Sequence, residues 1–263
     1  MGTGSFIWYE LMTPDPDVAT QFYGAVIGWN VPRPDGIGSG GRDYRMILRS
    51  DGRAAGGMLG LTPGMQQQGA MPCWLAYIEV DDVAATTRAI EADGGTTWMR
   101  MELPVGQIAM VGDPMGTPFC VMKPVPPPDQ PDARSDVFDT SAPQRVRWNE
   151  LASPDLQRAR QFYARHFGYR FDQVMPMGSL GDYCFMDHDG VRVGAILQQA
   201  PGMPAAGWVP CFGVESVAAA RRAIEAHGGR QLQDLHQVPG GAWVAVAADP
   251  AGAVFGITGA QGN

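Results

Sequence analysis

The chain has 263 residues, 45% of them hydrophobic and 17% charged, so it is long enough to bury a substantial core in one or two domains. Its 19 Lys and Arg against 27 Asp and Glu give a net charge of −8, which argues against nucleic acid and anionic membranes as partners, because both need a clustered positive surface. The four cysteines form no C-x-x-C pair and the first residues lack the apolar segment of a signal peptide, so we expect a reduced, cytoplasmic protein.

Internal repetition organises the whole chain. The segment 8–28 recurs as 148–168, and the segment 74–95 recurs as 208–229, so the second half duplicates the first. Each half is itself double, because a tryptophan, an acidic residue and a glycine recur at separations of seven and thirteen residues. The four sets are Trp8, Asp15 and Gly28; Trp74, Asp81 and Gly94; Trp148, Asp155 and Gly168; and Trp208, Glu215 and Gly228.

The elements expected in each repeat follow from this spacing. An apolar run such as 74–80 predicts a strand, the acidic residue can cap the helix that comes next, and the glycine supplies a left-handed helix end. About three short strands follow each helix. In the first half they are expected near 44–48, 55–59, 108–111 and 119–122.

Two other stretches are predicted to be irregular. The glycine-rich segment 36–41 lacks the Gly-Lys-Ser/Thr ending of a phosphate loop, so we interpret it as a loop over the mouth of a cleft. Six prolines between 124 and 143 indicate a semi-rigid linker. We therefore predict one domain at 1–125, a linker at 126–142 and a second domain at 143–263.

This pattern of strand, helix and three strands, taken in pairs, resembles the vicinal oxygen chelate superfamily of glyoxalases, bleomycin-resistance proteins and extradiol dioxygenases. The resemblance rests on Phe22-Tyr23 and Phe162-Tyr163 in the first helices and on Asp-Pro-x-Gly at 113–116 and 249–252. The Trp-x-Glu-Leu openings are similar to a two-domain bacterial group that includes a mycobacterial culture-filtrate antigen. The implied fold is α+β, with four βαβββ modules paired into two glyoxalase-like domains whose mixed sheets close partly around clefts.

The metal ligands that the resemblance implies are missing from this sequence. The position of the first ligand is taken by Trp8 and Trp148, and that of the final glutamate by Cys120 and Gly256. All four histidines lie in the second half and are interpreted as surface or packing residues. We therefore expect no metal and no cofactor. An all-oxygen site for a hard ion, built from the acidic residues Glu10, Glu79 and Glu102, stays as an alternative.

A cleft without metal needs other side chains to recognise a ligand. Because side chains alternate along a strand, Trp8 and Glu10 share one face, as do Trp148 and Glu150, and each pair could bind a flat or cationic molecule. The competing interpretation is that the tryptophans fill the core and that each glutamate only satisfies a local hydrogen bond. The other residues expected to line the clefts are Tyr77, Cys120, Met122, Cys211 and Trp243.

Three functions agree with these observations. The first is a small-molecule binder that takes an aromatic or cationic ligand without a metal. The second is an enzyme, either a glyoxalase-like lyase or an oxygenase or isomerase, with Glu10 or Glu150 as base. A non-standard metal site stays open for this enzyme. The third is a non-catalytic interaction protein with filled clefts. The tandem halves favour a monomer that contains its own pseudo-dimer, although a homodimer is also open.

Overall fold

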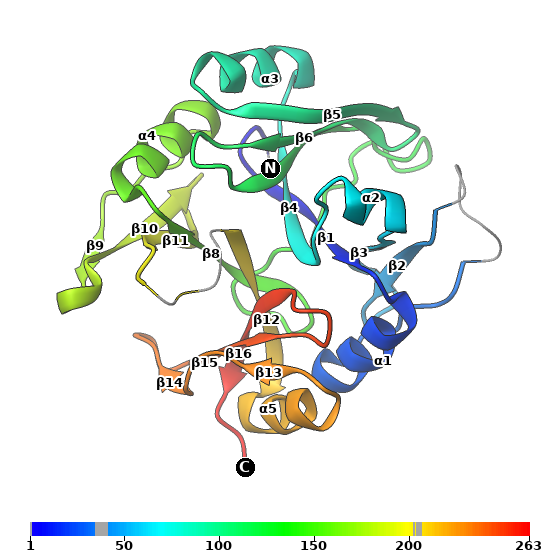
Figure 1. Ribbon diagram of the computed structural model, residues 1–263, viewed down its shortest axis with the longest axis vertical. Helices are drawn as coiled ribbons and strands as arrows, with labels where there is room; N and C mark the ends of the chain where they lie inside the picture. Colours follow the sequence, from blue (N-terminus) through cyan, green and yellow to red (C-terminus); the bar gives the residue numbers. More distant parts are fainter. Residues whose placement is uncertain (1, 35–41, 202, 204–206) are drawn as a thin grey trace. The chain divides into compact units, whose positions relative to one another are not determined.

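The computed structural model describes residues 2–34, 42–201, 203 and 207–263, and Figure 1 shows its elements along the chain. They form two mixed sheets of seven and nine strands with helices, which confirms the α+β class. The predicted loop at 36–41 lies outside the described residues. Within the described residues, no helix is both long and apolar enough to cross a membrane.

The first sheet has the strand order β2-β3-β1-β4-β7-β6-β5. Its strands are β1 (Phe6–Thr13), β2 (Tyr44–Leu48), β3 (Ala54–Gly60), β4 (Cys73–Glu79), β5 (Thr96–Leu103), β6 (Gly106–Gly112) and β7 (Pro118–Pro124). The helices in this stretch are α1 (Pro16–Ile27), α2 (Pro63–Gln67) and α3 (Val83–Ala92).

The second sheet has the order β13-β15-β16-β12-β8-β11-β10-β9, with β14 paired to β15. Its strands are β8 (Val146–Ser153), β9 (Val174–Pro176), β10 (Asp182–His188), β11 (Val191–Gln198), β12 (Gly207–Ser216), β13 (Arg230–Gln231), β14 (His236–Gln237), β15 (Trp243–Ala248) and β16 (Val254–Ala260). The helices here are α4 (Leu156–Phe167), α5 (Val217–Ala226) and a short 3-10 turn at Gly178–Leu180.

Strand pairing repeats four times, as the sequence does. In each repeat the first strand pairs in parallel with the last, giving β1 with β3, β4 with β7, β8 with β11, and β12 with β16. A helix must connect such parallel strands, since a tight hairpin cannot. The remaining strands add antiparallel partners, so both sheets are mixed.

Helix ends agree with the predicted spacing at most positions. Asp15 accepts hydrogen bonds from the first backbone N–H groups of α1, and Gly28 ends that helix in the left-handed conformation with φ +83°. The prediction was wrong by one residue at two starts. Asp82 rather than Asp81 caps α3, and Ser216 rather than Glu215 caps α5, because these side chains reach the third N–H of their helices.

Residue contacts group the chain into two compact units, and each unit combines segments from both sequence halves. Unit 1 contains the described residues within 1–7, 76–136 and 148–208, and unit 2 those within 8–75, 137–147 and 209–263. In unit 1, α3 packs on β5, β6 and β7, and Figure 1 shows this helix beside β5. In unit 2, α5 packs on β13, β15 and β16. The domain boundaries drawn from the sequence stay a prediction.

The core of unit 1 holds a buried chain of hydrogen bonds. Trp208 Nε1 donates to the Tyr163 hydroxyl at 3.2 Å, and that hydroxyl donates to Asp113 Oδ2, also at 3.2 Å. Asp113 Oδ1 accepts the backbone N–H groups of Met115 and Thr117, so the carboxyl also fixes the turn before β7. Burial raises the pKa of Asp113, although these donors act in the opposite direction.

Unit 2 contains an equivalent series of buried hydrogen bonds. Trp74 Nε1 donates to the Tyr23 hydroxyl at 2.9 Å, and Tyr23 donates to Asp249 Oδ2 at 3.2 Å. Asp249 Oδ1 accepts the N–H groups of Ala251 and Ala253. The aspartate of each Asp-Pro-x-Gly motif therefore accepts a hydrogen bond from a tyrosine on a helix distant in sequence. These hydrogen bonds connect the two repeats of each unit.

A charged cluster joins two helices of unit 1. Asp93, at the end of α3, accepts from Arg158 at 2.7 Å and contacts Arg165 and His166 at 3.0 Å each. Burial favours the neutral acid, but the hydrogen bonds from Arg158 and His166 outweigh it and lower the pKa of Asp93. His166 is thus a packing residue of the α3–α4 contact.

Replacing Asp93 by asparagine is expected to lower the free energy of unfolding by about 1–2 kcal/mol at pH 7, since the side chain is only 11% exposed. A carboxyl with a lowered folded-state pKa stabilises above its ordinary pKa, and this contribution is lost as the pH falls through the folded-state value. Urea unfolding should therefore show the deficit at pH 7 and not at strongly acidic pH. A deficit independent of pH would contradict this account.

The control is Glu91→Gln, which removes the half-exposed ion pair between Glu91 of α3 and Arg100 of β5. Exposed pairs contribute little, so a change below about 0.5 kcal/mol is expected.

Candidate functional site

Unit 1 presents a tryptophan, a tyrosine and a glutamate in a single hydrogen-bonded chain. Trp148 Nε1 donates to the Tyr183 hydroxyl at 2.9 Å, and this hydroxyl donates to Glu150 Oε2 at 2.7 Å. Trp148 and Glu150 come from β8 and Tyr183 from β10, with β11 between them. All three side chains are only partly buried. The protein therefore orients the Glu150 carboxylate within a group of partly exposed residues.

An aromatic wall continues this group on the same face of the sheet. Glu150 and Phe185 are both in register with Ala195, so their side chains leave the same face. The Phe185 ring meets Trp148 edge to face, with ring centroids 6.1 Å apart, and lies 5.4 Å from the Tyr183 ring. One carboxylate thus lies among three aromatic rings. We call Trp148, Glu150, Tyr183 and Phe185 the aromatic–acid cluster.

An arginine beside the cluster is already neutralised. The Arg192 guanidinium lies 4.5 Å from the Phe185 ring centre and donates to both carboxylate oxygens of Asp187, at 3.0 and 3.2 Å. It also donates to Gln173 at 2.8 Å. Arg192 therefore stiffens the wall, and its charge is already paired with Asp187.

Unit 2 contains the corresponding residues in a more enclosed arrangement. Trp8 Nε1 donates to the Tyr44 hydroxyl at 3.2 Å. Gly57 is in register with Glu10, and a side chain at Gly57 would collide with the Tyr44 hydroxyl, so only glycine leaves room for it. Glu10 is just 7% exposed. Burial and the charge of Glu10 raise the pKa of the Cys73 thiol to about 12, so this cysteine is no nucleophile at neutral pH.

These residues do not fit the divalent metal of the superfamily's metalloenzymes. At the expected first-ligand positions, both indoles donate N–H groups to tyrosine hydroxyls and offer no lone pair to a cation. Cys120 is buried, and Gly256 has no side chain. In the described part of the chain, no three His, Cys, Asp or Glu side chains form a group able to hold a metal, and this includes the three acidic residues of the all-oxygen alternative.

The other predicted lining residues fall into two groups. Tyr77 is in register with Cys120, and Met122 lies two residues further along β7, so these three share one face of unit 1. Cys211 and Trp243 do not share a face. Cys211 is in register with Gly256, whereas Trp243 pairs with Gly259, three residues along β16, so the two side chains leave opposite sides of the sheet.

Sequence reasoning missed both tyrosines of these clusters. Tyr44 and Tyr183 stand at matching places, each in an antiparallel strand after the first helix of its half. A comparison of the two halves beyond the helix would have found them, because a tyrosine stands in both copies. Their hydrogen bonds could not be predicted, because the tryptophan partners are 36 and 35 residues away in the chain.

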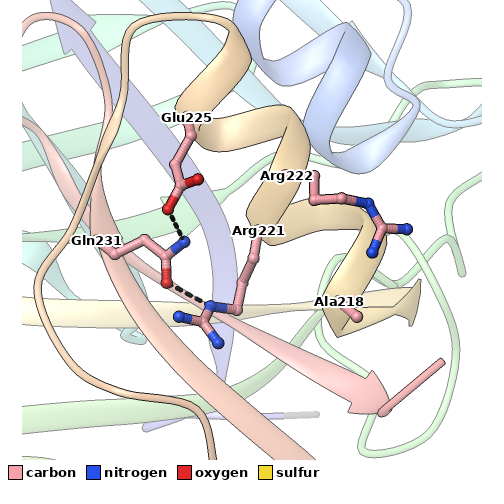
Figure 2. Close-up of a pocket in the computed structure, with 5 residues that line it drawn as sticks. All are labelled: Ala218, Arg221, Arg222, Glu225 and Gln231. Carbon is pink, nitrogen blue, oxygen red and sulfur yellow. Dashed lines mark hydrogen bonds between the residues drawn. The ribbon is translucent and has the colours of Figure 1, made fainter. Parts of the chain in front are cut away.

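A shallow depression elsewhere contains none of the predicted residues. It lies on α5 in unit 2 and has a volume of about 270 Å³. Figure 2 shows its polar lining, in which Gln231 accepts from Arg221 and donates to Glu225. These side chains already satisfy one another, so the depression is a poor candidate for a ligand site.

Comparison with known families covers both halves. Residues 8–122 match the family described as Glyoxalase-like domain, and residues 145–257 match the Glyoxalase/Bleomycin resistance protein/Dioxygenase superfamily. The chain is 26% identical over 253 residues to the Mycobacterium tuberculosis protein named "Putative glyoxylase CFP32", covering 95% of this chain and 92% of that protein. It is 27% identical over 271 residues to "Anthracycline biosynthesis protein DauV" of a Streptomyces species, covering 97% and 92%.

Solved structures agree on the fold. The Mn(II)-bound glyoxalase from Novosphingobium aromaticivorans superposes with a TM-score of 0.63 at 16% identity, over 100% of this chain and 83% of that one. These matches agree with the fourfold repeat and with the parallel pairing of the first and last strands in each repeat. The chain belongs to the glyoxalase/bleomycin-resistance/dioxygenase superfamily and contains two glyoxalase-like regions.

Proposed function

We propose that the protein binds a flat, positively charged aromatic molecule at the aromatic–acid cluster of unit 1, without a divalent metal. The single observation that supports this most is the Glu150 carboxylate held by the Tyr183 hydroxyl among aromatic rings. Rings recognise a planar ligand by stacking, and an oriented, partly desolvated carboxylate recognises a cation. Superfamily proteins bind small molecules, which agrees with this proposal.

The relatives suggest a chemical class for the ligand. One is named for anthracycline biosynthesis. Anthracyclines are planar polycyclic compounds, and their amino-sugar glycosides carry a positive charge, so they combine the two features that the cluster could recognise. We therefore choose an anthracycline glycoside with a charged amino sugar as the probe, and its uncharged aglycone as the matched ligand.

Replacing Glu150 by glutamine is expected to weaken binding of the charged glycoside about tenfold, because a partly exposed ion pair contributes about 1–1.5 kcal/mol. The aglycone should bind both proteins within about twofold, since stacking is unchanged. Quenching of probe fluorescence gives both dissociation constants. Equal losses for the two ligands, or no saturable binding of either, would contradict the proposal.

Two further variants locate the site. Trp148→Phe removes the indole donor to Tyr183 and should weaken both ligands. Glu10→Gln makes the same chemical change in unit 2, where the carboxylate is 7% exposed, and should leave both dissociation constants unchanged. A larger effect of Glu10→Gln than of Glu150→Gln would place binding in unit 2 instead.

A second candidate is catalysis with Glu150 as base. The 2.7 Å bond from Tyr183 holds the carboxylate in one orientation, as a general base requires. In that case Glu150→Gln would abolish turnover of a bound ligand while binding survives. Incubation of the bound probe with wild-type protein and with this variant, followed by mass spectrometry, separates catalysis from binding.

A further inference from the structure

An edge strand with a neighbour on one side lies in unit 1. Strand β5 is the last strand of the seven-stranded sheet, and within the described chain it pairs only with β6. It is eight residues long. Exposed edges of this length are rare in monomeric proteins, because their free N–H and C=O groups invite another strand.

The same edge exposes apolar side chains. Trp98 is 50% exposed, Met99 39% and Leu103 40%. The register of β5 with β6 places Met99, Met101 and Leu103 on one face, while Arg100 and Glu102 leave the other. Arg100 contacts Glu91 of α3 at 3.1 Å, so the charged face is the one next to that helix.

Backbone geometry shows which groups point away from the sheet. Leu103 and Gly106 close the two-residue turn between β5 and β6, so they exchange hydrogen bonds across the hairpin. Bonding alternates along an antiparallel pair, so Met101 also bonds to β6. The N–H and C=O groups of Arg100 and Glu102 then point toward the free edge.

We propose that β5 pairs with β5 of a second copy of this chain, antiparallel about a two-fold axis at Met101. Arg100 then lies opposite Glu102 of the second copy, and Glu102 lies opposite Arg100 of the second copy, so two ion pairs form. The outward N–H and C=O groups of these residues form hydrogen bonds between the two strands. On the other face Met99 packs against Leu103 of the second copy, and the two Met101 side chains meet. The strand is complementary to itself on both faces.

The two registers on either side of this one do not satisfy both charge and backbone. Shifting the axis to Arg100 or to Glu102 keeps the outward groups paired, but each shift puts a like charge directly opposite itself. Like charges facing across strands are destabilising, whereas opposite charges stabilise the pair. The occupant that this edge fits is therefore a second copy, held in one register. The proposal is independent of the ligand proposed above.

Charge reversal tests the pairing on the whole protein. Sedimentation velocity should show wild type moving from the 28.2 kDa monomer to a dimer as its concentration rises to about 100 µM. Arg100→Glu and Glu102→Arg should each raise the dimer dissociation constant at least about tenfold, through like-charge contacts across the axis. An equimolar mixture of the two variants should recover wild-type affinity within about threefold, because each supplies the charges that the other lacks.

A separate variant avoids the contact between Arg100 and Glu91. Met101→Lys sets two ammonium groups against each other at the axis and should also prevent dimerisation, whereas Met101→Leu should not. Thermal unfolding confirms that each variant is folded. A wild-type protein that stays monomeric, a dimer indifferent to these changes, or a mixture no tighter than its components would each overturn the proposal.

Discussion

Replacing Asp249 by alanine is expected to lower the free energy of unfolding by about 4 kcal/mol, the largest single effect we anticipate. The change leaves the buried Tyr23 hydroxyl, the buried Ala253 N–H and the partly buried Ala251 N–H without their acceptor. Each buried donor left unpaired costs about 1–3 kcal/mol. Urea unfolding monitored by tryptophan fluorescence measures the loss.

The matched control is Tyr23→Phe, which removes the hydroxyl but leaves both turn bonds of Asp249 in place. It should cost about 1–2 kcal/mol, clearly less than the alanine variant, because only the Trp74 donor is left without an acceptor. Asp113→Ala should reproduce the large loss in unit 1. Equal losses in Asp249→Ala and Tyr23→Phe would show that the turn bonds contribute nothing.

The deficit of Asp249→Ala should also depend on pH. Burial raises the pKa of Asp249 despite the hydrogen bonds that this carboxyl accepts, so the folded state holds the proton more tightly than the unfolded chain does. The stabilisation from this proton is complete below the ordinary carboxyl pKa of about 3.9 and is lost as the pH rises through the folded-state value. The gap between wild type and variant should therefore narrow from acid to neutral pH.

Replacing Gly194 by alanine is expected to cost about 3 kcal/mol and to disturb the aromatic–acid cluster. A Cβ atom at Gly194 would lie 2.0 Å from the backbone oxygen of Asn149, and backbone cannot move aside as a side chain can. The change would force β11 away from β8, which carries Trp148 and Glu150. Urea unfolding should show the loss, and binding of the charged probe should weaken.

Two other glycines check that prediction. Gly56 occupies the matching place in unit 2, 2.4 Å from the Tyr9 backbone oxygen when a Cβ is added, and Gly56→Ala should destabilise similarly. Gly64 in α2 has only the Thr62 side chain within 4 Å, at 3.9 Å, so Gly64→Ala should be neutral. If Gly194→Ala proved as mild as Gly64→Ala, close strand contact would not be the reason for a glycine there.

The four repeat tryptophans show how far sequence reasoning could reach. They occupy the same place in each repeat, and the structure gives each indole the same kind of partner, a tyrosine hydroxyl. Their surroundings nevertheless differ. Trp74 and Trp208 are buried in the core, whereas Trp8 and Trp148 are partly exposed beside a glutamate. For Trp8 and Trp148, packing and ligand recognition were the competing interpretations, and ligand recognition stays a prediction.

Local physics explains what the sequence by itself determined. Strand alternation, helix caps and left-handed glycines act over a few residues, so the order of strands and helices and the shared face of Trp148 and Glu150 were readable from the chain. The fold class and the missing metal ligands followed from the family resemblance of the repeats. Even local prediction has a limit. Asp82 and Ser216 cap their helices in place of the neighbouring Asp81 and Glu215, because either of two adjacent polar residues can cap a helix.

Tertiary structure alone decided the rest, because the decisive partners are distant in sequence. Tyr23 meets Asp249 across 226 residues, and no local pattern encodes that contact. Register likewise places Cys211 and Trp243 on opposite faces, which depends on how three strands align rather than on either residue. The sequence gives the chemistry of each side chain. Which side chains share a face of the sheet, and which are buried away from water, is determined only when the strands pair.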